Sequence, residues 1–126
     1  MRATVWFDGA CFGNPGPMGA GAVLQVAGKD RVLELPLGRG TNNEAEYHAV
    51  ILGLRHALAA GATEVHVRGD SELILRQLEG RYTVRSPNLK PLHDEARALL
   101  RRFQAVRLEW VPHQEALLRL AGSPGA

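Results

Sequence analysis

The feature that most constrains the fold is the close spacing of three β-prone runs near the start of the chain. They cover residues 3–7, 22–26 and 32–37. A tight glycine loop over residues 9–21 and a turn over residues 28–31 join them. Such links favour antiparallel neighbours, because a parallel return needs a crossover of about a dozen residues or more, usually a helix. We therefore expect the chain to open with an antiparallel β-meander.

The rest of the chain alternates between helical and strand patterns. Cap-type residues Thr41, Asn42 and Asn43 open a segment of good helix formers that closes at Gly61. Strand patterns follow at residues 64–69 and 106–111, and helical composition at residues 71–79, 89–103 and 115–121. A strand that returns through a helix lies parallel to its neighbour. The order βββαβααβα therefore predicts an α/β domain with a mixed five-stranded sheet and helices packed on it.

Length and composition fit one soluble domain. With 126 residues, of which 45% are hydrophobic and 22% charged, residues 1–126 can form a single domain with its own core. No apolar run reaches the roughly 18 residues of a spanning helix, and the apolar stretch before Asp8 is too short for a signal peptide. The single cysteine, Cys11, agrees with a reducing compartment. We expect a cytoplasmic monomer without membrane contact.

The basic residues suggest a phosphate-bearing partner. The net charge is +2, and 13 of the 15 basic residues are arginine, whose planar guanidinium suits bidentate phosphate contacts. An arginine-rich coding bias would give the same count. Within the basic stretch that holds Arg76, Arg81, Arg85 and Lys90 we predict phosphate contacts, most directly from Arg81 and Arg85. The alternative is a solvated helix face and loop.

Three acidic residues stand where the predicted elements meet. Asp8 ends the first strand, Asp70 ends the fourth, and Glu46 leads the helix expected above them. Each has an ordinary alternative: a turn residue for Asp8, a helix N-cap for Asp70 and a first-turn acid favoured by the helix dipole for Glu46. Glu46 is still unusual, because its helical face is otherwise apolar. The residues that share this face are Val50, Gly53, Leu54 and Ala57.

Together the three acids suggest a metal site. The first and fourth strands are expected to be sheet neighbours, so the side chains of Asp8, Glu46 and Asp70 are expected to converge. Carboxylates that lie close together repel one another unless a cation lies between them. Mg²⁺ prefers such oxygen ligands, with water and phosphate oxygens completing its shell. A divalent-metal site at these residues is therefore our hypothesis.

Three stretches of the sequence resemble the signature blocks of type 1 ribonuclease H. They read FDGACFGNPGP, TNNEAEYHAVILGL and RGDSELILRQL, and their spacing also matches. The resemblance implies the ribonuclease H-like fold and places the family's catalytic, metal-binding acids on Asp8, Glu46 and Asp70. The segment between Arg76 and Lys90 lacks room for the extra basic helix of some bacterial members. The chain therefore resembles the compact branch that includes archaeal enzymes.

The same resemblance assigns residues to nucleic acid. It implies substrate contacts from Asn14, Thr41, Asn42 and Asn43, whose amides and hydroxyl can bond to groups in the wide, shallow minor groove of an A-like duplex. Turn formation by Asn14 and helix capping by Asn42 and Asn43 are alternatives that are compatible with binding.

The chain departs from the family near its end. Members carry a fourth carboxylate in a pattern like N-x-x-A-D-x-L-A, whereas WVPHQEALLRLAG has Leu118 at that position, or Leu117 if the register shifts by one. Glu115 lies three residues before Leu118 and is a candidate substitute, with a first-turn acid as its alternative. His113 is a candidate for the loop histidine that assists turnover in some members, with an ordinary exposed loop histidine as its alternative.

The resemblance implies endonucleolytic hydrolysis of the RNA strand of RNA·DNA hybrids by a two-metal route with Mg²⁺ or Mn²⁺. The missing acid predicts reduced activity. The alternative is a weakened or inactive domain that binds hybrid or double-stranded RNA. A purely structural role would leave Asn14 and the Thr-Asn-Asn block unexplained.

Overall fold

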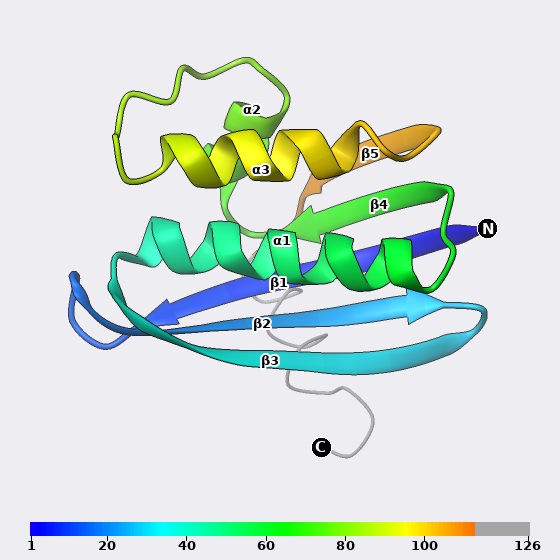
Figure 1. The fold of residues 1–126 in the computed structure, drawn as a ribbon, viewed down its shortest axis with the longest axis horizontal. Helices are drawn as coiled ribbons and strands as arrows, with labels where there is room; N and C mark the ends of the chain where they lie inside the picture. The colour runs from blue at the N-terminus through cyan, green and yellow to red at the C-terminus, as the bar shows by residue number, and fades with distance from the viewer. Residues whose placement is uncertain (113–126) are drawn as a thin grey trace.

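The computed structural model describes residues 1–112, and the helix expected over residues 115–121 lies outside them. The described elements follow the predicted order βββαβααβ (Figure 1). None of the helices in this part of the chain has the length and apolar character to cross a bilayer. The elements are β1 (Arg2–Cys11), β2 (Gly16–Val26), β3 (Lys29–Gly40), α1 (Asn42–Ala59), β4 (Glu64–Gly69), α2 (Glu72–Leu78), α3 (Lys90–Leu100) and β5 (Ala105–Trp110).

The five strands form one mixed sheet in the order β3-β2-β1-β4-β5. The first three pair antiparallel, which confirms the predicted meander. Strand β4 pairs parallel with β1 on one side and with β5 on the other. Figure 1 shows α1 and α3 running side by side in front of the sheet. The predicted neighbourhood of the first and fourth strands is therefore confirmed, and their carboxyl ends lie at the same edge.

Strand alternation builds the core between the sheet and the helices. Val5 and Phe7 of β1 and Val67 of β4 are buried against Val50 and Leu54 of α1. Complete burial of each such side chain contributes about 1.5 to 3 kcal/mol. The apolar face of α1 that also carries Glu46 therefore packs on the sheet, as its sequence pattern predicted.

The first hairpin is longer than its composition predicted. Strand β1 runs on to Cys11 and β2 begins at Gly16, so that residues 12–15 alone form the connection. The Phe12 amide donates to the Pro17 carbonyl at 2.9 Å and closes the hairpin. Glycine has a low intrinsic strand propensity, but pairing on both sides of β2 outweighs it. Asp8 consequently lies within the strand, opposite Gly21, and its interpretation as a turn residue is wrong.

Candidate active site

Two glycines bring the three acidic residues close together. A side chain at Gly9 would place its Cβ 2.3 Å from the backbone of Ala45 and Glu46, so β1 touches the first turn of α1 directly after Asp8. A Cβ at Gly69 would lie 2.3 Å from the ring of Phe7, so β4 packs equally tightly just before Asp70. The close approach of these backbones sets Asp8, Glu46 and Asp70 around one corner of the fold.

The end of β5 holds the backbone of Asp70 in place. The Trp110 indole Nε1 donates to the Asp70 carbonyl at 3.1 Å, and the Val111 amide donates to the Gly69 carbonyl at 2.9 Å. Ser71 is the N-cap of α2, because its side chain accepts a hydrogen bond from the Ile74 amide. The interpretation of Asp70 as a helix cap is therefore wrong.

Glu46 is held in an environment that opposes its ionisation. The pKa of Glu46 is raised from 4.5 to about 7. Burial is the largest cause, a hydrogen bond from the Ser71 side chain opposes it, and the negative charges of Asp70 and Asp8 add to it. Among the described residues its buried Oε2 has no hydrogen-bond partner. A buried acceptor without a donor is costly, so this oxygen is suited to an external cation or donor.

The side chain of the neighbouring Glu44, unlike that of Glu46, has a clear structural role. Its side chain accepts a hydrogen bond from the Thr41 amide, and the Thr41 hydroxyl accepts one from the Glu44 amide, which completes a capping box at the start of α1. Glu44 thus stabilises the helix end. Glu46, one half-turn later, has no such structural role among the described contacts.

The donor set fits a divalent ion. Asp8, Glu46 and Asp70 offer the carboxylate oxygens that Mg²⁺ and Mn²⁺ prefer, and the buried Glu46 Oε2 is available as a ligand. Within residues 1–112, no three acid, histidine or cysteine side chains are already grouped closely enough to hold one ion. The role of these acids as metal ligands stays a prediction.

The four residues to which the resemblance assigns nucleic-acid contacts lie together at the start of α1. They line one polar cavity of about 420 Å³. The Asn14 Oδ1 accepts a hydrogen bond from the Asn42 amide at 3.1 Å, which ties the first hairpin to the start of α1. Thr41 is the helix cap, so the capping alternative for Asn42 and Asn43 is wrong. The lining residues are Asn14, Thr41, Asn42, Asn43, Ser86, Asn88 and Leu89.

Sequence reasoning missed Ser86 and Asn88. Both lie in the connection before α3, which meets the Thr-Asn-Asn block across the cavity. The Ser86 carbonyl accepts from the amides of Leu89 and Lys90 and so forms the turn that starts α3. The run Ser-Pro-Asn before a helix is typical of a helix N-terminus. Its position opposite Asn14 depends on tertiary packing, which the local sequence pattern does not indicate.

The basic stretch is divided between paired and unpaired side chains. Arg81 and Arg76 both contact Glu79, at 3.4 and 2.7 Å, and Lys90 contacts Asp94 at 2.8 Å. Arg85 is exposed and makes no hydrogen bond or ion pair within residues 1–112. Exposed ion pairs of this kind are weak, so they do not prevent phosphate binding. The predicted phosphate contacts of Arg81 and Arg85 stay a prediction.

Two further predictions concern His113 and Glu115, together with the absent fourth carboxylate at Leu118 or Leu117. These residues lie outside the described part of the chain. Their roles stay predictions from the sequence.

The sheet order, the helices on it and the acids at adjacent strand ends define the ribonuclease H-like class of α/β domains. Residues 6–116 match the family described as reverse transcriptase-like, and the chain belongs to this family. Within it the chain has the compact type 1 ribonuclease H architecture that its motifs predicted.

Curated relatives give the same assignment. Over 115 residues the chain is 44% identical to the bifunctional protein Rv2228c of Mycobacterium tuberculosis, a match that covers 89% of this chain and 32% of that protein. Over 114 residues it is 40% identical to ribonuclease HI of Halobacterium salinarum, covering 88% of this chain and 57% of the relative. The chain thus spans about a third of the first relative and little more than half of the second.

Solved structures agree closely with the fold. The N-terminal RNase H domain of Rv2228c has a TM-score of 0.85 and 42% identity, with 92% of this chain and 91% of that chain covered. The complex of LC11-RNase H1 with an RNA/DNA hybrid has a TM-score of 0.82 and 33% identity, with 90% and 88% covered. The predicted ribonuclease H-like fold is therefore confirmed.

Proposed function

We propose that this domain hydrolyses the RNA strand of RNA·DNA hybrids endonucleolytically, with Mg²⁺ or Mn²⁺ as its cofactor. The observation that carries the proposal is the buried Oε2 of Glu46, which has no hydrogen-bond partner within residues 1–112 and lies in the field of two further carboxylates. A carboxylate in such surroundings is a candidate functional group, because the hydrogen bond from Ser71 does not offset the burial that raises its pKa. The names of the similar ribonuclease HI and of the LC11-RNase H1 hybrid complex support the same substrate class.

In this proposal Asp8, Glu46 and Asp70 together provide the carboxylate ligands of the metal ion. Asp8 lies on β1, Asp70 follows the neighbouring β4, and Glu46 lies in the first turns of α1, so the three carboxylates come from different elements. A bound divalent ion supplies water activation and stabilisation of the leaving oxygen at this site. Glu46 must be deprotonated to serve as a ligand, and the pKa of about 7 makes binding dependent on pH near neutrality.

The polar cavity positions the substrate. Asn14, Asn42 and Asn43 line this cavity at the start of α1, the helix that carries Glu46, and Thr41 has a hydroxyl that already takes part in the helix cap. Amide and hydroxyl groups can bond to 2′-hydroxyls, which distinguish RNA from DNA. The hybrid would therefore lie across the start of α1 and the first hairpin. We further propose that the protein acts as a monomer in the cytoplasm, with double-stranded RNA as a second ligand.

The direct test is incubation of the pure protein with an end-labelled RNA·DNA hybrid and either Mg²⁺ or Mn²⁺. We expect cleavage of the RNA strand only, leaving 5′-phosphate and 3′-hydroxyl ends, and no cleavage after chelation. A duplex of the same sequence with DNA in both strands is the matched control. Uncut hybrid with both metals, together with tight hybrid binding, would instead support the second candidate function.

That second candidate is a binding domain with weak or no catalysis. The observation that favours it is the aliphatic residue at the family's fourth carboxylate position, Leu118 or Leu117. We predict that Leu118→Asp raises the cleavage rate, because it restores an acidic ligand for the second ion. Glu115→Gln lowers the rate only if Glu115 has taken over that role. Rates equal to that of the parent in both variants, at matched folded concentration, would remove this segment from the metal site.

A further inference from the structure

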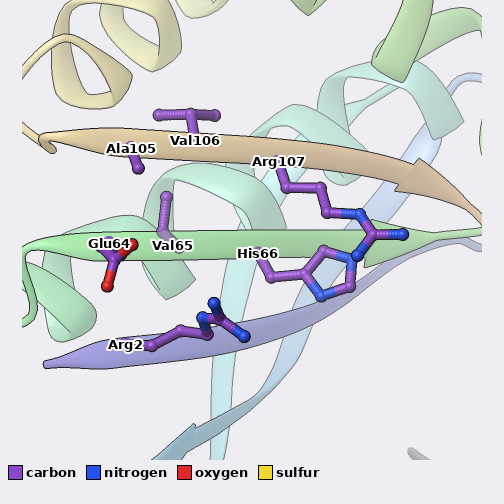
Figure 2. A pocket seen from close by; sticks show the side chains of 7 residues that line it. All are labelled: Arg2, Glu64, Val65, His66, Ala105, Val106 and Arg107. Carbon is purple, nitrogen blue, oxygen red and sulfur yellow. The ribbon is translucent and has the colours of Figure 1, made fainter.

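A second cluster of charged side chains lies far from the acids, at the amino ends of three neighbouring strands. It surrounds a small cavity of about 120 Å³ on β1, β4 and β5 (Figure 2). The three strands run parallel, so their amino ends share one edge of the sheet. The carboxyl ends with Asp8 and Asp70 lie roughly 20 Å away, the length of a six-residue strand. The cavity is therefore separate from the candidate active site. Its lining residues are Arg2, Glu64, Val65, His66, Ala105, Val106 and Arg107.

Strand register explains why cationic side chains meet here. His66 of β4 is directly opposite Arg107 of β5, and Arg2 of β1 is opposite Glu64. The alternate residues Ala3 and Val65 are buried in the core, so the charged residues project from the other face of the sheet. Figure 2 shows Arg2 and Arg107 reaching from the flanking strands toward His66, whereas the carboxylate of Glu64 lies on the far side of the cavity.

The two arginines are available for a ligand. Both are exposed, and neither has a hydrogen bond or an ion pair with any residue in the described range 1–112. The carboxylate of Glu109 on the same face is already engaged. It accepts a hydrogen bond from His66 Nε2 at 2.7 Å and forms an ion pair with Arg68, whose Nε is 3.1 Å away. Two guanidinium groups against the single carboxylate of the lining leave the cavity with excess positive charge.

The pKa of His66 depends on its burial and on the charged groups around it. Burial lowers its pKa, the hydrogen bond and charge of Glu109 raise it, and the charges of Arg107 and Arg68 lower it again. The net direction is downward, so the imidazole is mainly neutral at neutral pH. Its Nε2 is bonded to Glu109 and its ring lies within the field of the arginines. An anion between the arginines would oppose that field and raise the pKa of His66.

We propose that this cavity binds a phosphate group. A guanidinium presents a planar fork of donors that matches phosphate oxygens, and two such forks from opposite sides give a charge-assisted clamp. A volume of about 120 Å³ is about four times the share of one water molecule in the liquid, roughly 30 Å³. That space suits a tetrahedral anion, with any attached nucleoside left outside. The phosphate belongs either to a free phosphomonoester or to a nucleic-acid backbone.

The test uses metal-free protein in a phosphate-free buffer with chelator, so the acidic corner and hydrolysis play no part. His66 ring signals and arginine side-chain signals are followed by NMR during separate titrations. The probes are inorganic phosphate, a nucleoside 5′-monophosphate and a single-stranded oligodeoxynucleotide. We expect shifts at Arg2, His66 and Arg107 and a rise in the pKa of His66. Binding of the small anions alone identifies a phosphomonoester, and binding of the oligonucleotide at this cavity identifies a backbone phosphate.

Charge-matched variants make the proposal falsifiable. Arg107→Gln should weaken phosphate binding by about tenfold, the effect of losing a charge-assisted hydrogen bond. Arg102→Gln removes an equal charge from an exposed residue outside the cavity and should leave the affinity unchanged. Arg2→Gln provides a second variant should Arg107→Gln not fold. Equal weakening in the Arg102 control, or no shift of the cavity signals with any probe, would overturn the proposal.

Discussion

The two ends of the parallel strands carry charges of opposite sign in different surroundings. At the carboxyl ends, Asp8 and Asp70 stand beside Glu46, whose Oε2 is buried. At the amino ends, Arg2 and Arg107 are exposed to solvent. Water solvates the exposed arginines, whereas one oxygen of the Glu46 carboxylate is buried and has no donor among the described residues 1–112. Burying a charged group without a partner costs a large amount of free energy, whereas a charged group that stays exposed keeps its hydration.

The contrast between a buried carboxylate and exposed arginines predicts that substitutions at the two ends will differ in the size of their effects. A buried acid that opposes folding is retained only where another interaction compensates for it, so it indicates function strongly. An exposed arginine has little effect on folding stability, so it indicates a function only where its position relative to neighbouring groups suits a ligand. Substitutions at the acidic end should therefore change activity and stability by large amounts. Substitutions that affect exposed contacts should change binding by small amounts.

The largest effect is expected from Asp70→Asn. The substitution keeps the size of the side chain but removes the negative charge that we propose to hold a divalent ion. Loss of an outer-shell partner typically costs about 10- to 100-fold, and loss of a direct ligand should exceed that range in cleavage rate. The measurement is single-turnover cleavage of a labelled hybrid. Asp94→Asn, which alters an exposed acid paired with Lys90 on α3, is the control and should cleave like the parent.

Much of this fold was predictable because local patterns and tertiary packing agree. Residues 64–69 alternate buried and half-buried side chains, and β4 has the predicted bounds. The apolar stripe of α1 is buried as expected. The first hairpin was harder, because its glycines have no side-chain pattern to mark a strand. Its ends are set by pairing with β3 and by the close contact of Gly9 with α1, which are non-local.

The candidate site was only partly predictable. The resemblance identified Asp8, Glu46 and Asp70, and the structure brings their charges near one another. Of the cap-type residues Thr41, Asn42 and Asn43, the structure places Thr41 at the N-cap of α1, and at α2 the N-cap is Ser71 and not Asp70. Neighbouring cap-type residues satisfy the same pattern, and hydrogen-bond geometry chooses among them.

The next largest effect concerns stability and pH. Because the folded pKa of Glu46 is raised from 4.5 to about 7, its contribution favours folding fully below pH 4.5 and is lost as the pH rises through about 7. Glu46→Gln has no charge to bury and should unfold less readily than the parent above neutrality, by about 1 to 3 kcal/mol. The difference should vanish in acid.

Urea unfolding of the metal-free protein in acidic and in mildly alkaline buffer measures this difference. Glu72→Gln, at an exposed acid 3.8 Å from Arg76, is the matched control and should show no such gain. Equal unfolding free energies for Glu46→Gln and the parent at alkaline pH would contradict the desolvated state of Glu46. Added Mg²⁺ should stabilise the parent but not Glu46→Gln, because binding needs the ionised acid.

A smaller effect is expected from the exposed arginines of the basic stretch. Arg85 has no ion pair among the described residues, whereas Arg81 is 3.4 Å from Glu79. If both contact phosphate, Arg85→Gln should reduce the salt slope of hybrid binding by about one, and Arg81→Gln by less. Hybrid affinity is measured over a range of salt concentrations in the Asp70→Asn background, which prevents cleavage. Slopes unchanged in both variants would assign these side chains to a solvated surface.

The smallest effect concerns an apolar side chain at the acidic end. Phe12 is 81% exposed, and its amide is fixed to the Pro17 carbonyl at 2.9 Å. Phe12 lines a groove together with Asp8 and Ala10, so its exposed aromatic ring shares a surface with one of the three acids. We predict that Phe12→Ala weakens hybrid binding about threefold, the loss of a modest aromatic contact with a sugar, and leaves unfolding unchanged, because little area is buried. Phe12→Leu keeps an apolar side chain without the ring, so it distinguishes a specific aromatic contact from a general hydrophobic contribution to binding. Affinities equal to the parent in both variants would mean that the acidic end binds nucleic acid through polar and charged groups alone.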